Sequence, residues 1–271
     1  MSNAKSTLSN LYASVMTRRG LRKFNEFLVK LGMKGLGLLF SHEYPAENGE
    51  LFFAKRVIGR YKVKSLFDVG ANQGTYAKMF IDLQFGGEIF CFEPHPTTFK
   101  KLDSVLTAPN IKKFDLALSG EKGSFHIYDY LSHDGSEHAS LFKGVIEEVH
   151  KGKTVAHLVK VDTLDEFTKD QHIEKIGLLK IDTEGNEFNV LQGARYLILN
   201  NKIDIVHFEF NEMNVISRVF MRDFIKLLPN FNFYRLLPNG FLPLHYDHSL
   251  LMELFSYQNI VAIRKDIDQE T

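Results

Sequence analysis

The sequence predicts an α/β fold built on a doubly wound, mostly parallel β-sheet, and two observations lead to that prediction. From residue 65 onward, short apolar runs alternate with stretches of helical periodicity, the pattern of strands joined by crossover helices. The apolar runs are nearly continuous, as in strands that are buried on both faces. With 271 residues, 44% hydrophobic and 24% charged, the chain is long enough to bury a large core without disulfides or structural metals.

The expected strands and helices follow one another along the chain. Parallel strands are expected at 65–70, 87–93, 111–119, 176–185 and 202–211. Helices are expected at 74–84, at 96–106, which opens with a favourable proline, and at 186–199. Two segments of alternating polarity, 123–130 and 156–163, predict an antiparallel pair inserted between the third and fourth parallel strands. Residues 231–244 and 257–265 predict an edge pair that closes the sheet.

The first 64 residues differ in charge from the rest of the chain. They carry twelve Lys or Arg against four Glu, whereas the whole chain has a net charge of zero. Residues 18–40 predict one amphipathic helix, weakened by glycines after Gly32, and a second helix is expected at about 48–60. We therefore expect a helical extension at 1–62 and a main domain at 63–271. The basic extension either packs on the domain with a solvated face or contacts a polyanion or a membrane surface.

Cysteine usage and hydropathy bear on the compartment. The single cysteine, Cys91, lies in an apolar run and is expected to be a buried small hydrophobe, so no disulfide within the chain is possible. No apolar run approaches the length of a membrane span, and the N-terminus lacks the apolar region of a signal peptide. The sequence predicts a cytoplasmic protein, with peripheral membrane contact through residues 18–40 as an open alternative.

Ligands in an open α/β sheet bind beyond the carboxyl ends of the strands. The residues that follow the expected strands are therefore candidates, and most of these junctions carry an acidic side chain. They are Asp68 to Gly74, Glu93, Asp115 to Ser119, Asp182 to Glu187, and Glu209 to Asn211. Together they predict a pocket rimmed with carboxylates.

The first of these turns, DVGANQG, argues against a dinucleotide. It lacks the three-glycine pattern on which a pyrophosphate rests, and Asp68 stands where a phosphate would approach. A carboxylate there attracts an ammonium or sulfonium group, while Gly70 and Gly74 allow close approach of a bulky group. Glu93 follows about 20 residues later, where an acidic side chain binds ribose hydroxyls. The pocket is thus suited to adenosine with a cationic tail, as in S-adenosyl-L-methionine.

Five segments carry a resemblance to a known family. FDVGANQGTYA, CFEPHPTTFKKL, LALSGEKGSFHIY, VDTLDEF and LLKIDTEGNEFNVLQGA occur in the order expected of the FkbM-type methyltransferases, within the class I S-adenosylmethionine-dependent fold. The resemblance covers residues 65–212, and KIDTEGNE is its most specific element. It implies a Rossmann-like, seven-stranded sheet of order 3-2-1-4-5-7-6 with an antiparallel last strand. It also implies O-methylation, commonly of a sugar or polyketide hydroxyl.

The resemblance also implies which residues bind the cofactor. Asp68, Gly70, Asn72 and Gly74 would line the methionine end, and Glu93 would bind the ribose. Asp115, which stands where the family often has Asn, would lie by the adenine together with Ala117 and Leu118. Ala71, Thr75, Pro94 and Asp182 complete the expected cofactor set.

Methyl transfer is an in-line displacement, so positioning supplies most of the rate, but a hydroxyl acceptor must still lose a proton. Asp182 is the first candidate base, followed by His207 and Glu209. The simpler interpretation of His207, inside an apolar strand, is a core histidine. Four residues are expected near the substrate: Glu184, Glu187, His138 and His245. Glu187 is equally explained as a carboxylate at a helix N-terminus.

No spacing in the sequence demands a metal, although a divalent cation between Asp182 and Glu209 is conceivable because hard cations prefer carboxylate oxygens. The polar segment 129–144, which contains His133 and His138, is either a lid over the site or a plain loop. Residues 131–155 and the N-terminal extension fall outside the resemblance.

Two other functions remain open at this stage. The first is a nucleic-acid methyltransferase that uses the basic N-terminal segment. The core lacks both the Asn/Asp-Pro-Pro-Tyr motif for base amines and a basic run interleaved with aromatic residues, so we expect no nucleic-acid partner. The second is a non-catalytic domain that keeps the fold and docks at a membrane. The expected acceptor is a small molecule or a glycan.

Overall fold

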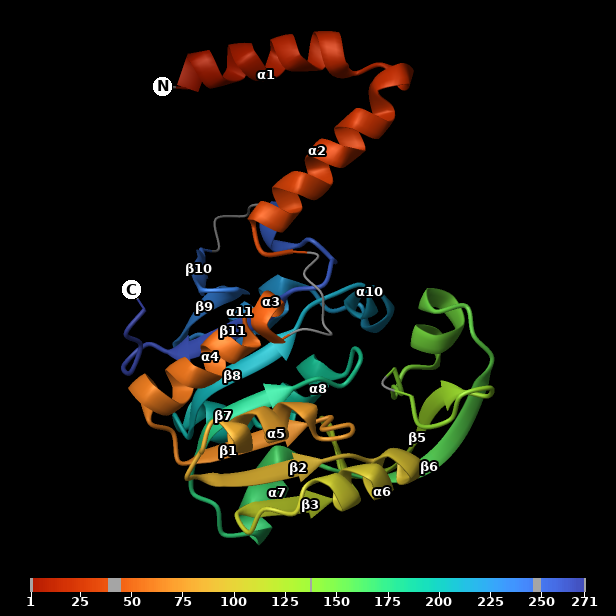
Figure 1. Cartoon of the computed structure of the whole chain (residues 1–271), viewed down its shortest axis with the longest axis vertical. Helices are drawn as coiled ribbons and strands as arrows, with labels where there is room; N and C mark the ends of the chain where they lie inside the picture. The colour runs from red at the N-terminus through yellow and green to blue at the C-terminus, as the bar shows by residue number, and fades with distance from the viewer. Residues whose placement is uncertain (1, 39–44, 137, 246–249, 271) are drawn as a thin grey trace.

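The computed structural model describes residues 2–38, 45–136, 138–245 and 250–270, and an eight-stranded sheet forms its centre (Figure 1). The strand order is β10-β9-β11-β8-β7-β1-β2-β3. The first five strands of this sheet along the chain are mutually parallel: β1 (Ser65–Val69), β2 (Glu88–Phe92), β3 (Ile111–Phe114), β7 (Ile176–Ile181) and β8 (Ile203–Glu209). The predicted α/β class with a Rossmann-like sheet is confirmed.

The C-terminal segment extends this sheet by three strands. β9 (Phe231–Leu237) and β10 (Gly240–Leu244) form a hairpin, and β11 (Asn259–Arg264) lies antiparallel between β8 and β9. The sheet therefore has eight strands where seven were expected, because β10 adds a strand at the edge.

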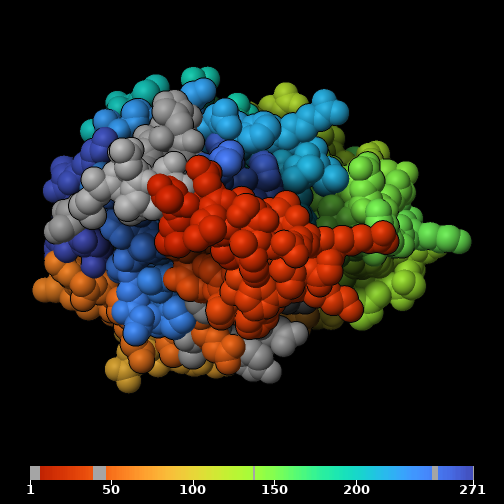
Figure 2. Space-filling model, turned by 90° about the horizontal axis from the view of Figure 1, so that it is seen from above, coloured from red at the N-terminus to blue at the C-terminus, as the bar shows by residue number. Residues whose placement is uncertain are grey.

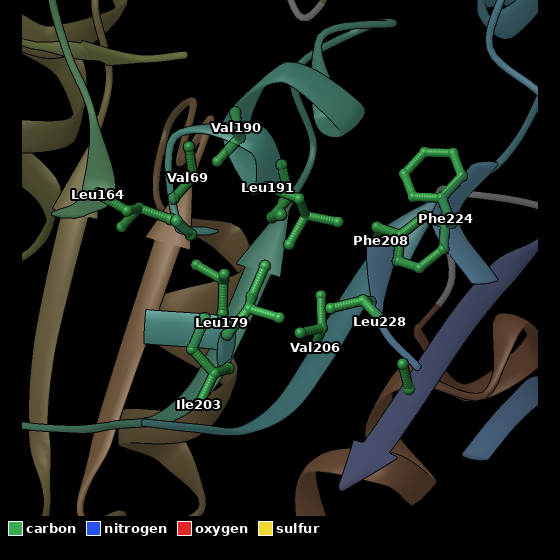
Figure 3. Packing of buried hydrophobic residues seen from close by; sticks show 14 of the residues in the cluster. Val69, Leu164, Leu179, Val190, Leu191, Ile203, Val206, Phe208, Phe224 and Leu228 are labelled. Carbon is green, nitrogen blue, oxygen red and sulfur yellow. The ribbon is translucent and has the colours of Figure 1, made fainter. Parts of the chain in front are cut away.

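Helices cover both faces of the sheet because neighbouring residues of its buried strands point to opposite sides. Phe67 and Leu179 pack toward α7 (Leu164–Asp170), α8 (Glu187–Gln192), α9 (Arg195–Leu199) and α11 (Met221–Leu227). Figure 3 shows Leu179, Val206 and Phe208 in this layer. Leu66 and Leu178 pack on the other face with α4 (Glu50–Arg56), α5 (Thr75–Asp82) and α6 (Pro96–Val105), where Cys91 is also buried.

The insertion forms a second, three-stranded sheet beside the carboxyl ends of the main strands (Figure 1). β5 (Gly123–Tyr130) pairs antiparallel with β6 (Thr154–Asp162), as predicted, and β4 (Ala117–Leu118) pairs with the other edge of β6. The single strand expected at 111–119 is thus two strands in two sheets. A π-helical turn, η3 (Val145–Val149), lies in the connection between β5 and β6.

The N-terminal region has two parts. α1 (Ser2–Met16), η1 (Arg19–Leu21) and α2 (Arg22–Gly35) project from the body, whereas α3 (Pro45–Asn48), α4 and η2 (Val57–Tyr61) lie against it (Figure 1). α1 was not predicted. The helix expected at 18–40 ends at Gly35, and residues 39 and 40 lie outside the described residues.

Two short helices complete the fold, α10 (Met213–Ser217) and η4 (Leu250–Met252). Among the helices of the described ranges, none is both long and apolar enough to cross a bilayer.

Candidate functional site

Two adjoining pockets lie at the carboxyl ends of the parallel strands. The first, which we call the inner pocket, is lined mainly by the ends of β1 and β2, by β4 and by the insertion. The second, the acidic cleft, has a volume of about 760 Å³ and extends toward α4, α5 and α10. Four residues line both: Gly70, Asn72, Asp182 and Glu184. The two spaces therefore meet at the turns that follow β1 and β7.

Glu93 connects the end of β2 to the turn after β1 through hydrogen bonds. One carboxylate oxygen accepts from the Asn72 backbone N–H at 2.9 Å, and the other accepts from the His95 N–H at 2.8 Å. Burial raises the pKa of Glu93 to about 7, although these two backbone donors oppose the shift. Each oxygen keeps one further acceptor position, and Glu93 lines the inner pocket, so the group is arranged to accept two more hydrogen bonds.

Two buried oxygens at this site have no hydrogen-bond partner among the described residues. They are Oδ2 of Asp68, a side chain only 1% exposed, and Oδ1 of Asn72. Burial raises the pKa of Asp68 to about 7, with Lys180 opposing the shift. Orphaned buried acceptors are costly, so they indicate a missing donor. A ligand with an ammonium group over β1 would supply one, and the methionine end of S-adenosylmethionine has that group.

The backbone at the junction of the two pockets is strained. Asn72 and Glu184 both have left-handed conformations, with φ of +48° and +52°. Non-glycine residues adopt this region at a cost of about 1–3 kcal/mol, and such residues cluster at functional sites. Both residues line both pockets, whereas six other non-glycine residues of the described chain have the same conformation elsewhere.

The acidic cleft holds one buried cation among several carboxyl groups. Lys180 is 3% exposed, donates to Oδ2 of Asp182 at 2.9 Å and lies 5.1 Å from the ring centroid of Tyr76. Burial disfavours its charge, but Asp182 and the other nearby carboxylates outweigh burial and raise the pKa of Lys180 above its usual range. Burial and the neighbouring Asp182 raise the pKa of Glu209 well above its ordinary value.

The insertion contributes a histidine pair to the same cleft. Nδ1 of His138 lies 3.4 Å from Oε1 of Glu184, and the His138 ring stacks on that of His150 with centroids 4.3 Å apart. Ser140 also donates to the backbone oxygen of Glu184 at 2.7 Å. Burial raises the pKa of Glu184 to about 7, and His138 opposes the shift. The segment expected to be a lid or a plain loop thus contacts the turn after β7.

Comparison with known proteins agrees with this geometry. The model of the methyltransferase FkbM domain matches residues 68–234, more than half of the chain. The chain belongs to the FkbM methyltransferase family. It is therefore an enzyme, a methyltransferase, as predicted, and the expected cofactor is S-adenosyl-L-methionine, on which the family depends.

Two curated relatives match over most of this region. One is the 2-O-methyltransferase NoeI of Sinorhizobium fredii, 23% identical over 185 residues, which are 65% of this chain and 75% of the relative. The other is the hexuronic acid methyltransferase AglP of Haloferax volcanii, 28% identical over 166 residues, 60% of each chain. Among solved structures, the plantazolicin methyltransferase BpumL in complex with SAH covers 94% of this chain and 93% of its own, with a TM-score of 0.45 and 9% identity.

Most of the expected cofactor residues of this FkbM methyltransferase lie at the two pockets. Glu93, Pro94, Ala117 and Leu118 line the inner pocket, and Asp68, Ala71 and Thr75 line the acidic cleft. Asp115 is exposed and is not among the described residues that line either pocket; its neighbour Leu116 lines the inner pocket instead. The place of Asp115 by the adenine therefore stays a prediction.

The two glycines of the first turn were expected to allow close approach of a bulky group, but the structure shows that each lies close to other residues of the protein. A Cβ on Gly70 (φ +79°) would lie 1.7 Å from the backbone oxygen of Asp182. A Cβ on Gly74 (φ +86°) would lie 2.7 Å from the Leu106 side chain, and Gly74 lines neither pocket in the described part of the chain. Both glycines are therefore required by close approach within the protein, and only Gly70 also borders the pockets.

His207 is a core residue of this enzyme. It is fully buried; Nδ1 lies 2.9 Å from the Tyr76 hydroxyl and Nε2 lies 3.0 Å from Oδ1 of Asn259. Burial, followed by the nearby Lys180, lowers the pKa of His207 to about 3. His207 is not among the described residues that line the two pockets. The structure favours the simpler of the two interpretations, a core histidine hydrogen-bonded to Tyr76 and Asn259.

Two of the expected substrate residues also lie away from the acidic cleft. Oε1 of Glu187 accepts from the Thr183 N–H, the Thr183 hydroxyl and the Gly185 N–H, at 2.9 to 3.1 Å. Glu187 therefore closes the turn before α8, and it is 3% exposed. His245 is exposed just after β10, the edge strand, outside the described lining of both pockets. Glu184 and His138 line the cleft, whereas Glu187 and His245 are not among its described lining residues, and their substrate role stays a prediction.

Several lining residues were not predicted. In the cleft they include Glu50, Tyr76, Lys180 and Tyr257, and in the inner pocket Ile127 and Leu141. Lys180 and Tyr76 are within the quoted family segments, so their proximity to the motif was a usable signal. Glu50 and Tyr257 come from segments far from the motifs, and nothing in the sequence indicates that they meet there.

A His–Asp–His cluster lies beside the inner pocket. Nε2 of His95 and Nε2 of His157 lie 3.0 and 2.7 Å from the same oxygen of Asp134. Their ligand atoms are close enough to hold a metal ion. However, Nδ1 of His95 accepts the Thr97 N–H, which places the proton of a neutral ring on Nε2, where it donates to Asp134. The cluster is explained as a hydrogen-bonded link between α6, β6 and the loop after β5.

Proposed function

We propose that this enzyme transfers a methyl group from S-adenosylmethionine to a hydroxyl of a sugar or a similar small polyhydroxy molecule. The observation that carries the proposal is the shared wall of the two pockets, formed by Gly70, Asn72, Asp182 and Glu184. A donor in the inner pocket and an acceptor in the acidic cleft would meet at this wall, in the close arrangement that displacement requires. The printed names of NoeI and AglP, an O-methyltransferase and a methyltransferase of a sugar acid, support this class.

The residues present fit the cofactor. Asp68 and Asn72 would receive the donors of the methionine end through their unpartnered oxygens, and Glu93 would bind the ribose hydroxyls. Leu116, Ala117 and Leu118 would supply the apolar surface for the adenine. When bound, the cofactor supplies the electrophilic methyl group. The protein positions the donor and the acceptor and accepts the proton.

Asp182 is retained as the candidate base. It lines both pockets, and its ion pair with Lys180 holds the carboxylate at their junction. The structure also favours a second candidate, the His138–Glu184 pair, in which a carboxylate beside Nδ1 orients an imidazole toward the acceptor. Glu209 is the weaker choice because it lines only the acidic cleft, whereas Asp182 lines both pockets.

The charge of the cleft bears on the acceptor. Six carboxyl groups line it, against a single Lys or Arg among the described lining residues, namely Lys180. At a pH above about 7, where Asp68 and Glu184 are ionised, an acceptor that carries its own carboxylate would be repelled, and the same holds for the phosphates of a nucleic acid. We therefore favour a neutral or cationic acceptor over a uronic acid, and we do not favour the nucleic-acid alternative.

The test is a methyl-transfer assay with labelled S-adenosylmethionine and matched pairs of acceptors, each pair being a neutral glycoside and its uronic counterpart. Label in the neutral glycoside, located on oxygen by mass spectrometry, is the expected result. Cofactor binding by calorimetry without transfer to any hydroxyl would instead support the non-catalytic alternative. The division at residue 62 and a cytoplasmic location remain proposals; limited proteolysis and fractionation of cells would test them.

A further inference from the structure

The two N-terminal helices expose matching apolar faces. In α1, Leu8, Leu11, Tyr12 and Val15 have the spacing i, i+3, i+4, i+7, and they are 45–69% exposed. In α2, Phe24, Phe27, Leu28 and Leu31 have the same spacing, and all but the half-buried Leu28 are 48–58% exposed. Residues with this spacing lie on one side of a helix, so each helix carries a continuous apolar stripe. We call residues 2–37 the arm.

Basic side chains border these stripes. Residues 1–37 carry seven Lys or Arg and one acidic residue, Glu26, which is paired with Arg22 at 2.6 Å. Lys23 and Lys30 are four and three positions from Phe27, and Lys34 is three from Leu31, so these lysines lie along the edge of the α2 stripe. A helix with an apolar face and a basic border is typical of segments that lie in a membrane interface.

The arm is held in place without covering these stripes. Tyr12 donates to the Asn25 side chain at 2.6 Å, and Asn25 donates to the Met16 backbone oxygen at 3.0 Å, which fixes the elbow between α1 and α2. At the base of the arm, Arg235 donates to the Leu36 oxygen at 2.9 Å, and Leu38 is fully buried. Figures 1 and 2 show the arm, in red, projecting from the body and lying across its upper side.

We propose that the arm binds the surface of an anionic lipid bilayer, with its apolar stripes in the interface and its basic residues at the headgroups. Three kinds of occupant were weighed. A second copy of the arm would bring two strongly positive surfaces together, and a nucleic acid would leave the apolar stripes exposed to water. An anionic bilayer offers both an apolar region and negative charge, at about 1 kcal/mol for each basic residue near the surface.

The experiment is sedimentation of the full chain with vesicles of phosphatidylcholine alone or mixed with phosphatidylglycerol. We expect binding to the mixed vesicles that weakens as salt rises. Neutralising Arg18, Arg19, Arg22 and Lys23 together to Gln should lower the partition coefficient by at least about tenfold. Phe24→Ser with Phe27→Ser should have a similar effect because it removes the apolar contact. The matched control neutralises four exposed lysines of the body, Lys100, Lys101, Lys153 and Lys160, and should bind as the parent does.

Several outcomes would overturn the proposal. Equal binding to neutral and anionic vesicles would remove the electrostatic argument. Unchanged binding of both arm variants would remove the electrostatic and the apolar argument together. A dimer in light scattering that Phe24→Ser with Phe27→Ser abolishes, without vesicle binding, would assign the stripes to a second copy. The proposal is independent of the methyl-transfer proposal because no described residue of the arm lines either pocket. Calorimetry with S-adenosylmethionine on the same variants separates the two.

Discussion

The ammonium of Lys180 lies 2.9 Å from a carboxylate oxygen of Asp182 at the point where the two pockets meet. Lys180 is nearly inaccessible to solvent, whereas Asp182 borders both pockets. This pair places a fixed positive charge beneath a group of carboxylates that would otherwise repel one another. The following predictions concern this pair and its surroundings.

Asp182→Asn should lower turnover and leave the affinity for the cofactor nearly unchanged. The amide keeps the shape of the side chain but accepts no proton, so kcat should fall by about 100-fold or more if Asp182 is the base. The affinity for S-adenosylmethionine should change by less than about threefold, since the main cofactor contacts come from other residues. Steady-state kinetics and calorimetry on the same preparation measure both quantities.

The matched variants for that experiment are His138→Gln and Glu184→Gln. If Asp182→Asn retains turnover while these two lose it, the His138–Glu184 pair is the base and Asp182 only positions the acceptor. Their separation of 3.4 Å makes this a direct alternative. A fall of kcat in all three variants would indicate that the residues act as one unit.

Lys180→Met should destabilise the fold and shift its pH dependence. Lys180 is buried but Asp182 is 34% exposed, so removing the cation should cost about 1–3 kcal/mol by leaving the carboxyl groups of the cleft without it. Lys180 also opposes the rise in the pKa of Asp68, so that pKa should rise further in the variant. Urea unfolding measures the stability. The surface pair Lys78–Asp82, with both side chains more than half exposed, supplies the control, and Lys78→Met should cost less than about 1 kcal/mol.

Cofactor affinity should rise with pH through about 7. Burial raises the pKa of Asp68 to about 7, so at pH 6 most of the ligand-free protein holds a proton there, and a cationic group must displace it. Between pH 6 and pH 8 the ionised fraction grows by about tenfold, and the affinity should follow. Asp68→Asn should weaken binding and flatten this dependence. A flat profile in the parent protein would argue against the contact between Asp68 and the cofactor.

The same shifts predict how the stability of the ligand-free protein depends on pH. Asp68, Glu93 and Glu184 have folded-state pKa values of about 7, above the values of about 4 in an unfolded chain. The folded state therefore binds more protons than the unfolded state between these values, and stability falls as pH rises from about 4 to 7. Thermal unfolding at pH 5 and pH 8 should give a lower midpoint at pH 8. Saturating cofactor should reduce the difference.

The two glycines of the first turn should respond differently to alanine. Gly70→Ala places a Cβ against the backbone of the turn after β7, so it should displace the shared wall and abolish cofactor binding. Gly74→Ala meets only leucine side chains, and its main cost is a left-handed alanine, about 1 kcal/mol. Its cofactor affinity should stay near that of the parent. Gly86→Ala, with open space around the new methyl group, serves as the control.

The prediction from sequence succeeded where a single local pattern is enough. The continuous apolar runs identified β1, β2, β7 and β8, because most residues of a strand buried on both faces are apolar. The acidic positions at the strand ends identified Asp68, Glu93 and Asp182 because parallel strands bring their carboxyl ends to one edge. It left His207 open between a base and a core histidine, since an imidazole in an apolar strand looks the same whether it faces a pocket or is satisfied in the core.

The sequence by itself determined the fold class, the family and the edge of the sheet at which the pockets lie, since periodicity and short motifs are local properties of the chain. Only the tertiary structure decided that Glu50 and Tyr257 reach the cleft, that Lys180 pairs with Asp182, and that Gly74 faces leucines. These are contacts between segments far apart in sequence, or choices of side-chain direction. Such contacts depend on how the whole core packs, and no local pattern records them.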